Sequence, residues 1–144
     1  AIVLRACQGE QEFPALVAIW RSAVDATHDF VAPEYLDQIE VDLLSTYLYN
    51  VRLTVAEIDG QPVGFSGVAE RRLEMLFVDD RFRGRGVGSA LLDHAVQHLG
   101  VTDLDVNEQN SQAVAFYTHK GFEVVGRSEL DSAGQPYPLL HMRR

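Results

Sequence analysis

The chain has 144 residues, enough for one domain with a single core that buries about two-thirds of the unfolded surface. Its formal net charge of −9 argues against nucleic-acid binding, because such binding depends on lysines and arginines that neutralise phosphates. No apolar run approaches the length of a membrane span, and one cysteine, Cys7, can form neither an internal disulfide nor a zinc cluster. We therefore expect a cytoplasmic protein with no membrane or nucleic-acid partner, no metal site and a reduced, packed thiol.

The first half of the chain predicts a strand, two helices and three antiparallel strands. Apolar residues at helical spacing indicate the first helix, and Pro33 is typical of the start of the second. Asp59-Gly60 is a strong hairpin signal between the second and third strands. In order, the predicted elements are a strand over 2–6, helices over 11–24 and 33–49, and strands over 51–58, 63–68 and 73–78.

The second half alternates between helices and strands. The predicted elements are a helix over 86–99, a strand over 101–106, a helix over 110–119 and strands over 122–128 and 137–142. Prolines near the last strand favour an edge or irregular position for it. Together the two halves predict an α/β (α+β) fold, with a mixed, mostly antiparallel sheet of about seven strands and helices on both faces.

One stretch, from Leu76 to Leu92, runs from an apolar strand through a glycine-rich basic turn into an amphipathic helix. Gly84, Gly86 and Gly88 lack the Cβ atoms that would keep a ligand from the backbone, and the first turn of the helix supplies unpaired N–H groups. Such a turn is suited to a phosphate or pyrophosphate. Positive charge is added by Arg81, Arg83 and Arg85.

Two other kinds of glycine-rich turn fit less well. A nucleotide-hydrolase loop needs four residues between its glycines and then Gly-Lys-Ser/Thr, whereas these glycines alternate and no lysine follows. A dinucleotide-binding fingerprint needs Gly or Ala where this chain has Ser89. An NAD-dependent oxidoreductase is therefore disfavoured, also because the first half of the chain predicts antiparallel strands.

The remaining pattern, Arg83-x-x-Gly86-x-Gly88, resembles the coenzyme A pyrophosphate signature of the GNAT superfamily of N-acetyltransferases. A second stretch, 110–122, is similar to another motif of that family, Asn-x-x-Ala-x-x-Phe-Tyr-x-x-x-Gly-Phe, at every specified position. Segments 24–30 and 136–140 look specifically like the bacterial YjaB-type acetyltransferases.

The resemblance implies a single N-acetyltransferase domain over 1–144 that uses acetyl-coenzyme A. In the family, the strands that correspond to 73–78 and 101–106 splay apart, and the pantetheine arm lies in the opening. The implied cofactor-binding residues are Phe77, Val78, Arg83, Gly84, Arg85, Gly86, Val87, Gly88, Ser89, Asn110 and Tyr117. Asn is also among the best helix N-caps, so Asn110 can serve as a cap, a ligand or both.

Acetyl transfer also needs an acid for the departing thiolate, and the position of Tyr117 matches the family tyrosine. The general base stays open between Glu74, which lies on the strand over 73–78, and ordered water. His28, Asp105 and His141 are further alternatives. Each of these five residues also has an ordinary structural explanation as a core aromatic, a surface group or a paired polar group.

The sequence therefore predicts an acetyl-coenzyme A-dependent N-acetyltransferase. Its acceptor is a primary amine, either a small molecule or a protein lysine. A non-catalytic module that binds or senses acyl-coenzyme A is the alternative, although such a module does not need a proton donor such as Tyr117. The sequence leaves open the acyl chain length and whether the protein is a monomer or a homodimer.

Overall fold

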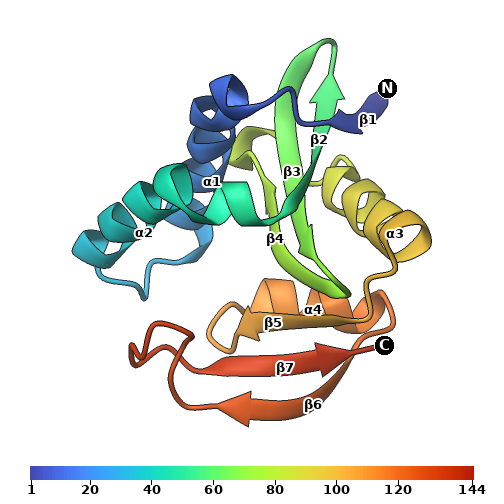
Figure 1. Cartoon of the computed structure of the whole chain (residues 1–144). Helices are drawn as coiled ribbons and strands as arrows, with labels where there is room; N and C mark the ends of the chain where they lie inside the picture. The colour runs from blue at the N-terminus through green and yellow to red at the C-terminus, as the bar shows by residue number, and fades with distance from the viewer. The chain divides into compact units, whose positions relative to one another are not determined.

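The structure is a computed structural model that describes all 144 residues. The chain forms two compact units, residues 1–101 (the first unit) and residues 102–144 (the second unit), whose elements are labelled in Figure 1. Seven strands and four α-helices follow one another along the chain in the predicted order. The pairings within each unit are antiparallel, which confirms the predicted fold class.

The first unit contains a four-stranded sheet in the order β1-β2-β3-β4. Its strands are β1 (Ile2–Ala6), β2 (Arg52–Ile58), β3 (Gln61–Ala69) and β4 (Arg72–Val78). Asp59 and Gly60 form the two-residue turn between β2 and β3, with φ values of 52° and 79°. Positive φ at both positions matches the right-handed twist of the flanking strands, so the predicted hairpin is confirmed.

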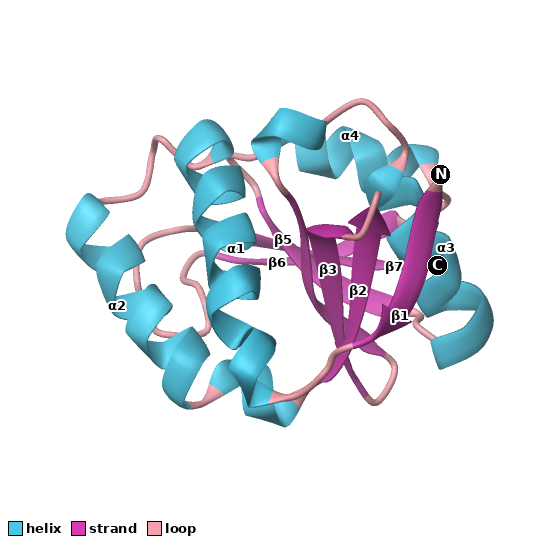
Figure 2. Ribbon diagram, turned by 90° about the horizontal axis from the view of Figure 1, so that it is seen from above, coloured by secondary structure: helices cyan, strands magenta, loops and turns pink.

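Three helices flank this sheet. α1 (Phe13–Thr27) and α2 (Pro33–Ser45) lie on one side of it, and α3 (Val87–Leu99) lies on the other (Figure 2). A short 3-10 turn, η1 (Glu10–Glu12), precedes α1. The apolar stripe of α1 forms much of the core on its side of the sheet. Its buried residues are Phe13, Leu16, Val17, Ile19, Trp20 and Val24.

The second helix is shorter than predicted. α2 ends at Ser45, and the chain continues into a separate 3-10 turn, η2 (Tyr47–Asn50), that buries Leu48. Thr46 leaves the helical region with φ −141°, and the Ser45 hydroxyl donates to the Val41 carbonyl at 2.9 Å. Serine and threonine are weak helix formers that compete for backbone hydrogen bonds, which explains the break.

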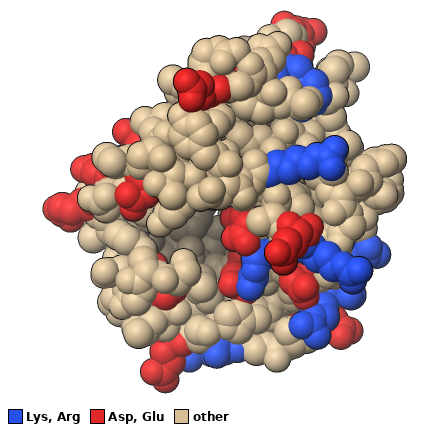
Figure 3. All heavy atoms as spheres, viewed as in Figure 1, with Lys and Arg blue, Asp and Glu red and all other residues tan.

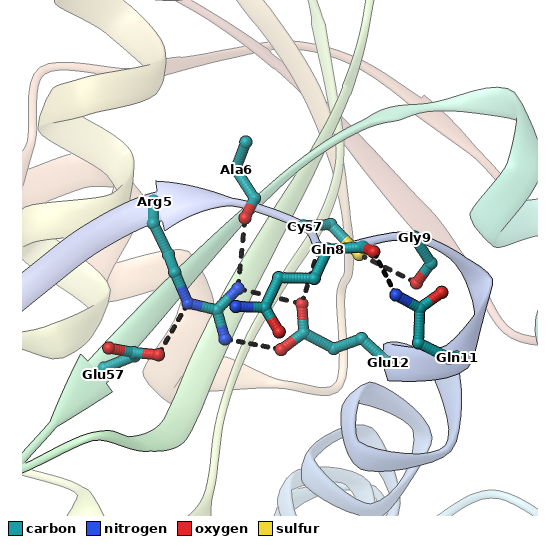
Figure 4. Close-up of polar contacts among 8 residues, drawn as sticks. All are labelled: Arg5, Ala6, Cys7, Gln8, Gly9, Gln11, Glu12 and Glu57. Carbon is teal, nitrogen blue, oxygen red and sulfur yellow. Dashed lines mark hydrogen bonds and ion pairs between the residues drawn. The ribbon is translucent and has the colours of Figure 1, made fainter.

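An ionic cluster joins β1, β2 and the start of α1 (Figure 4). The Arg5 guanidinium donates to Glu12 at 2.9 and 2.5 Å and to Glu57 at 2.6 Å, while the Gln8 N–H donates to Glu12 at 2.9 Å. Glu12 is buried, with 8% of its surface exposed. Its hydrogen bonds with Arg5 lower the pKa of Glu12 to about 2, so the carboxylate is ionised at neutral pH.

The second unit contains a three-stranded sheet and one helix. Its elements are β5 (Asp103–Asn107), α4 (Ser111–His119), β6 (Glu123–Ser128) and β7 (Leu139–Arg143). The strand order is β5-β7-β6, so the last strand lies between two partners. The edge position predicted for it is wrong, because Pro136 and Pro138 precede the strand and remove no hydrogen bond from the ladder.

Acidic residues outnumber basic residues in the sequence, and several basic side chains form ion pairs with them. Several basic side chains lie beside acidic side chains on the face shown in Figure 3. Ion pairs within the units include Arg143 with Asp103 at 2.8 Å and Arg127 with Glu108 at 2.6 Å. No helix of the structure has both the length and the apolar character that crossing a membrane requires.

Candidate active site

The turn between β4 and α3 has an open backbone. A 3-10 turn, η3 (Asp80–Phe82), follows β4 and leads to Gly84 and Gly86, whose φ values are 76° and 82°. These left-handed conformations are costly for residues with a Cβ, so the turn favours glycine at both positions. A Cβ at either glycine would have no neighbouring atom within 4 Å. The glycines therefore leave open space beside the backbone.

The N-terminus of α3 has no side-chain cap. Gly86 is the N-cap residue, and its carbonyl accepts from the Ala90 N–H at 3.0 Å. The N–H groups of Val87, Gly88 and Ser89 belong to the first turn, where an α-helix provides no partner. These donors and the positive end of the helix dipole favour an anion. The predicted phosphate site fits this local geometry.

Packing against β3 fixes the start of α3. Val87 and Leu91 are buried in a cluster with Val63 of β3. Gly64 permits this contact, because a Cβ at that position would lie 2.8 Å from Cγ1 of Val87. The sequence analysis did not single out Gly64, and its effect on the helix start could be seen only once the two elements were placed together.

Asp79 anchors the beginning of the turn. Its N–H donates to the Val63 carbonyl at 2.8 Å, and its carboxylate accepts from the Arg81 N–H at 3.0 Å and from the Arg81 guanidinium at 2.9 and 3.1 Å. These bonds with Arg81 lower the pKa of Asp79. Ser22 of α1 donates to Asp79 at 3.2 Å and accepts from the Asp80 N–H at 3.0 Å.

The three arginines of the turn differ in their surroundings. Arg81 is held by Asp79, whereas Arg83 makes a longer ion pair with Asp80 at 3.4 Å. The Arg85 guanidinium lies 5.2 Å from the centre of the Phe82 ring, within the range of a cation–π contact. Arg81 thus helps to hold the turn through Asp79, and Arg83 and Arg85, whose contacts are longer, are better placed to contact an anion.

The candidate residues of β4 occupy different environments. Phe77 pairs with Phe65 of β3 at a ring-centroid distance of 5.8 Å, while Val78 packs toward α3. Glu74 is exposed, and its carboxylate lies 3.6 Å from the guanidinium of Arg72. Such exposed ion pairs contribute little stability, and this one leaves Glu74 accessible to solvent.

Asn110 and Tyr117 both belong to α4 in the second unit. Asn110 is the N-cap, with its side-chain oxygen accepting from the Ala113 N–H at 3.2 Å. This confirms the capping role and leaves the amide nitrogen able to donate to a ligand. The Tyr117 ring is buried against Phe116 and Phe122, with ring centroids at 5.3 and 6.1 Å. Burial raises the pKa of Tyr117, so its phenol stays protonated at neutral pH.

The other candidate bases have protein partners. His28 contacts the Thr27 hydroxyl at 2.8 Å, and burial lowers its pKa so that the neutral form is favoured. His141 is bonded to Asp105 at 2.6 Å and to the Ser128 hydroxyl at 2.6 Å. The sequence analysis did not pair Ser128 with His141. No group of three or more His, Cys, Asp or Glu side chains is arranged to hold a metal ion.

The predicted site residues therefore form two groups. The first unit holds the turn over 83–89 together with Phe77, Val78 and Glu74, and the second unit holds Asn110 and Tyr117.

A family model described as an acetyltransferase (GNAT) domain matches residues 21–143. The chain belongs to the GNAT acetyltransferase family. This family relationship confirms the resemblance that the two sequence motifs indicated.

The GNAT relatives include two enterobacterial proteins named peptidyl-lysine N-acetyltransferase YjaB. The protein of Escherichia coli K12 is 47% identical over 133 residues, which cover 92% of this chain and 90% of the relative. That of Salmonella typhimurium LT2 is 45% identical over 133 residues, covering 92% and 91%. The solution structure of apo-form YjaB from E. coli superposes with a TM-score of 0.90 at 44% identity, covering 99% of this chain and 97% of that one.

As a GNAT protein, the chain is an N-acetyltransferase that uses acetyl-coenzyme A. The predictions of the enzyme class and the cofactor are confirmed. The uncapped start of α3, with open space beside Gly84 and Gly86, is chemically suited to the pyrophosphate of this cofactor. When bound, acetyl-coenzyme A supplies the acetyl thioester, and the protein supplies hydrogen-bond donors and proton-transfer groups.

Proposed function

We propose that the protein transfers the acetyl group of acetyl-coenzyme A to a primary amine, specifically the side chain of a lysine in a protein. The uncapped N-terminus of α3 carries the cofactor part of this proposal. The acceptor part rests on the relatives named peptidyl-lysine N-acetyltransferase, which match more than nine-tenths of this chain.

Backbone groups and arginines are the proposed cofactor contacts. The N–H groups from Gly84 to Ser89 would donate to the pyrophosphate, and the side chains of Arg83 and Arg85 would add charge-assisted bonds, while the N–H of Arg83 donates to the Asp80 carbonyl. The side-chain nitrogen Nδ2 of Asn110 would donate to the pantetheine arm. It is able to do so because the capping bond uses the side-chain oxygen. Backbone groups of Phe77 and Val78 would bind the same arm, and the N–H of Val78 would stabilise the oxyanion that forms from the thioester carbonyl.

Proton transfer is assigned to Tyr117 and Glu74. Acetyl-coenzyme A would supply the acetyl thioester that the amine attacks, and Tyr117 would give its phenolic proton to the sulfur of the leaving coenzyme A. Glu74 accepts the proton that the amine loses, directly or through water. The phenol of Tyr117 carries a proton at neutral pH and so has one to give, although burial raises its pKa and makes it a weaker acid than an exposed phenol. The exposure of Glu74 is compatible with access by an acceptor.

Thiol release in the presence of lysine peptides tests this function. We expect release from acetyl-coenzyme A that depends on the peptide, with mass spectrometry locating the new acetyl group on the lysine side chain. The matched control is the same peptide with its lysine already acetylated, which should give only the background rate. Tight cofactor binding without release from any peptide or small amine would favour the alternative of a non-catalytic acyl-coenzyme A-binding module. Release with small amines alone would refute the protein acceptor.

A further inference from the structure

Three polar side chains form a hydrogen-bonded chain across the sheet of the second unit. His141 of β7 contacts Asp105 of β5 through Nδ1 at 2.6 Å and Ser128 of β6 through Nε2 at 2.6 Å. The strand register places them on one face. His141 lies opposite Asp105 in one ladder and opposite Gly126 in the other, and Ser128 follows two residues after Gly126.

Gly126 makes room for this arrangement. A Cβ at this position would lie 3.3 Å from Cδ2 of His141, closer than a side chain comfortably tolerates. Without that Cβ, the imidazole can lie across β6 and reach the hydroxyl of Ser128. The contact between His141 and Ser128 thus depends on the absence of a side chain at Gly126.

The nucleophilic form of this hydrogen-bonded chain has an ionised Asp105 and a neutral His141. An ionised Asp105 can only accept, so Nδ1 of His141 carries a proton and donates it to the carboxylate. In that form Nε2 of the imidazole is an acceptor, and the Ser128 hydroxyl donates to it. This is the arrangement that makes a serine hydroxyl nucleophilic, because the imidazole can take its proton as the oxygen attacks.

The three residues are accessible to small reagents. The side chain of His141 is 35% exposed and that of Asp105 is 27% exposed. Ser128 lies at intermediate exposure at the end of β6, the strand at the edge of this sheet. None of the three has a role in the acetyl transfer proposed above, which assigns proton transfer to Tyr117 and Glu74.

We propose that Ser128 is an activated nucleophile that accepts acyl groups from activated esters and thioesters, with His141 as its base and Asp105 as the positioning residue. Ser128 Oγ bonds to the acyl carbon, and the bond from that carbon to the leaving oxygen or sulfur breaks. The serine proton passes to His141 Nε2 and from there to the leaving group. A water molecule then attacks the ester while His141 takes its proton. The bond from the acyl carbon to Ser128 Oγ breaks, and His141 gives the proton to Oγ, which releases the carboxylic acid and restores Ser128.

Acylation of the full-length protein by p-nitrophenyl acetate tests this site without coenzyme A or an amine. We expect release of p-nitrophenol and a mass increase of one acetyl group, with peptide mapping locating the group on Ser128. Ser128→Ala should abolish the adduct, and His141→Gln should slow acylation by about 10²-fold or more. Ser132→Ala, which changes an exposed serine in the turn before β7, is the matched control and should react like the unaltered protein.

Asp105 is tested by a pair of variants. Asp105→Asn should slow acylation by about 10²-fold, because an amide does not hold His141 in the required tautomer, whereas Asp105→Glu should restore part of the rate. A purely structural contact would lower the free energy of unfolding in both variants without this difference in acylation.

A fluorophosphonate probe tests the same serine in the unaltered protein and so does not depend on the folding of any variant. The proposal is supported if the probe labels Ser128 and if p-nitrophenyl acetate, added as a competitor, slows this labelling. The proposal is overturned if Ser128 stays unlabelled, if the acetyl group is found on another residue, or if His141→Gln reacts as fast as the unaltered protein. None of these results would bear on lysine acetylation by the site at α3.

Discussion

Replacing Gly86 by alanine should separate the stability of the turn from its capacity to bind coenzyme A. Gly86 has φ 82° and ψ 10°, and a Cβ in this left-handed conformation costs about 1–2 kcal/mol. No atom lies within 4 Å of the new Cβ, so the apo protein should suffer no clash beyond this backbone strain. The variant should remain folded, because native domains are stable by about 5–15 kcal/mol.

The same Cβ would occupy the space proposed for the pyrophosphate. A hydrogen bond to a charged group is worth about 1.5–3 kcal/mol, so displacement of the ligand from one N–H should weaken coenzyme A binding by about 10- to 100-fold. Isothermal titration calorimetry measures the affinity, and urea denaturation measures the free energy of unfolding.

Gly100→Ala is the matched control for this experiment. Gly100 ends the same helix in the same left-handed region, with φ 72° and ψ 24°, and a Cβ there also has no neighbour within 4 Å. Both variants should lose about 1–2 kcal/mol of stability, but only Gly86→Ala should lose coenzyme A affinity. Equal affinities in the two variants would refute the assignment of the pyrophosphate to the start of α3.

Three further perturbations test the acid, the anchor of the turn and the ionic cluster. Tyr117→Phe should lower turnover by about 10²-fold or less with little change in coenzyme A affinity, and unchanged turnover would remove Tyr117 from the mechanism. Asp79→Asn should weaken the bonds to Arg81 and Ser22, lowering the free energy of unfolding by about 1–3 kcal/mol in urea denaturation and weakening coenzyme A binding. Glu12→Gln should lower stability at pH 7 by up to about 3 kcal/mol, the equivalent of a pKa lowered from 4.5 to about 2. The pKa of Glu12 is lower in the folded state than in the unfolded state, so this contribution to stability is complete above pH 4.5 and is lost as the pH falls toward 2. A stability difference between the unaltered protein and Glu12→Gln that stayed constant from pH 6 to pH 2.5 would contradict the role given to the Glu12 carboxylate.

Local signals made much of the fold predictable. Asp59-Gly60 specified a hairpin because few other residue pairs accept positive φ at both positions, and the apolar periodicity of α1 specified its buried face. Prolines were harder to interpret, since Pro136 and Pro138 lie just before β7 rather than within it. The central position of β7 depends on pairing with strands elsewhere in the chain, which local sequence patterns do not encode.

The candidate site likewise contains some residues that local sequence signals identify and others that they do not. The glycines of the turn were informative because their spacing reflects the local backbone, and Asn110 was recognisable as an N-cap from its place before α4. Ser22 carried no such signal, since its contact with Asp79 joins residues 57 positions apart. The contact of Ser128 with His141 likewise required the register of two strands, including the irregularity beside Gly126.

The most direct test of the central claim combines calorimetric titration with acetyl-coenzyme A and thiol release from the same sample. We predict binding of acetyl-coenzyme A, followed by thiol release that depends on a lysine peptide and acetylates its side chain. A protein that is folded by circular dichroism but does not bind acetyl-coenzyme A, or that binds it and releases no thiol with any amine, would contradict the account.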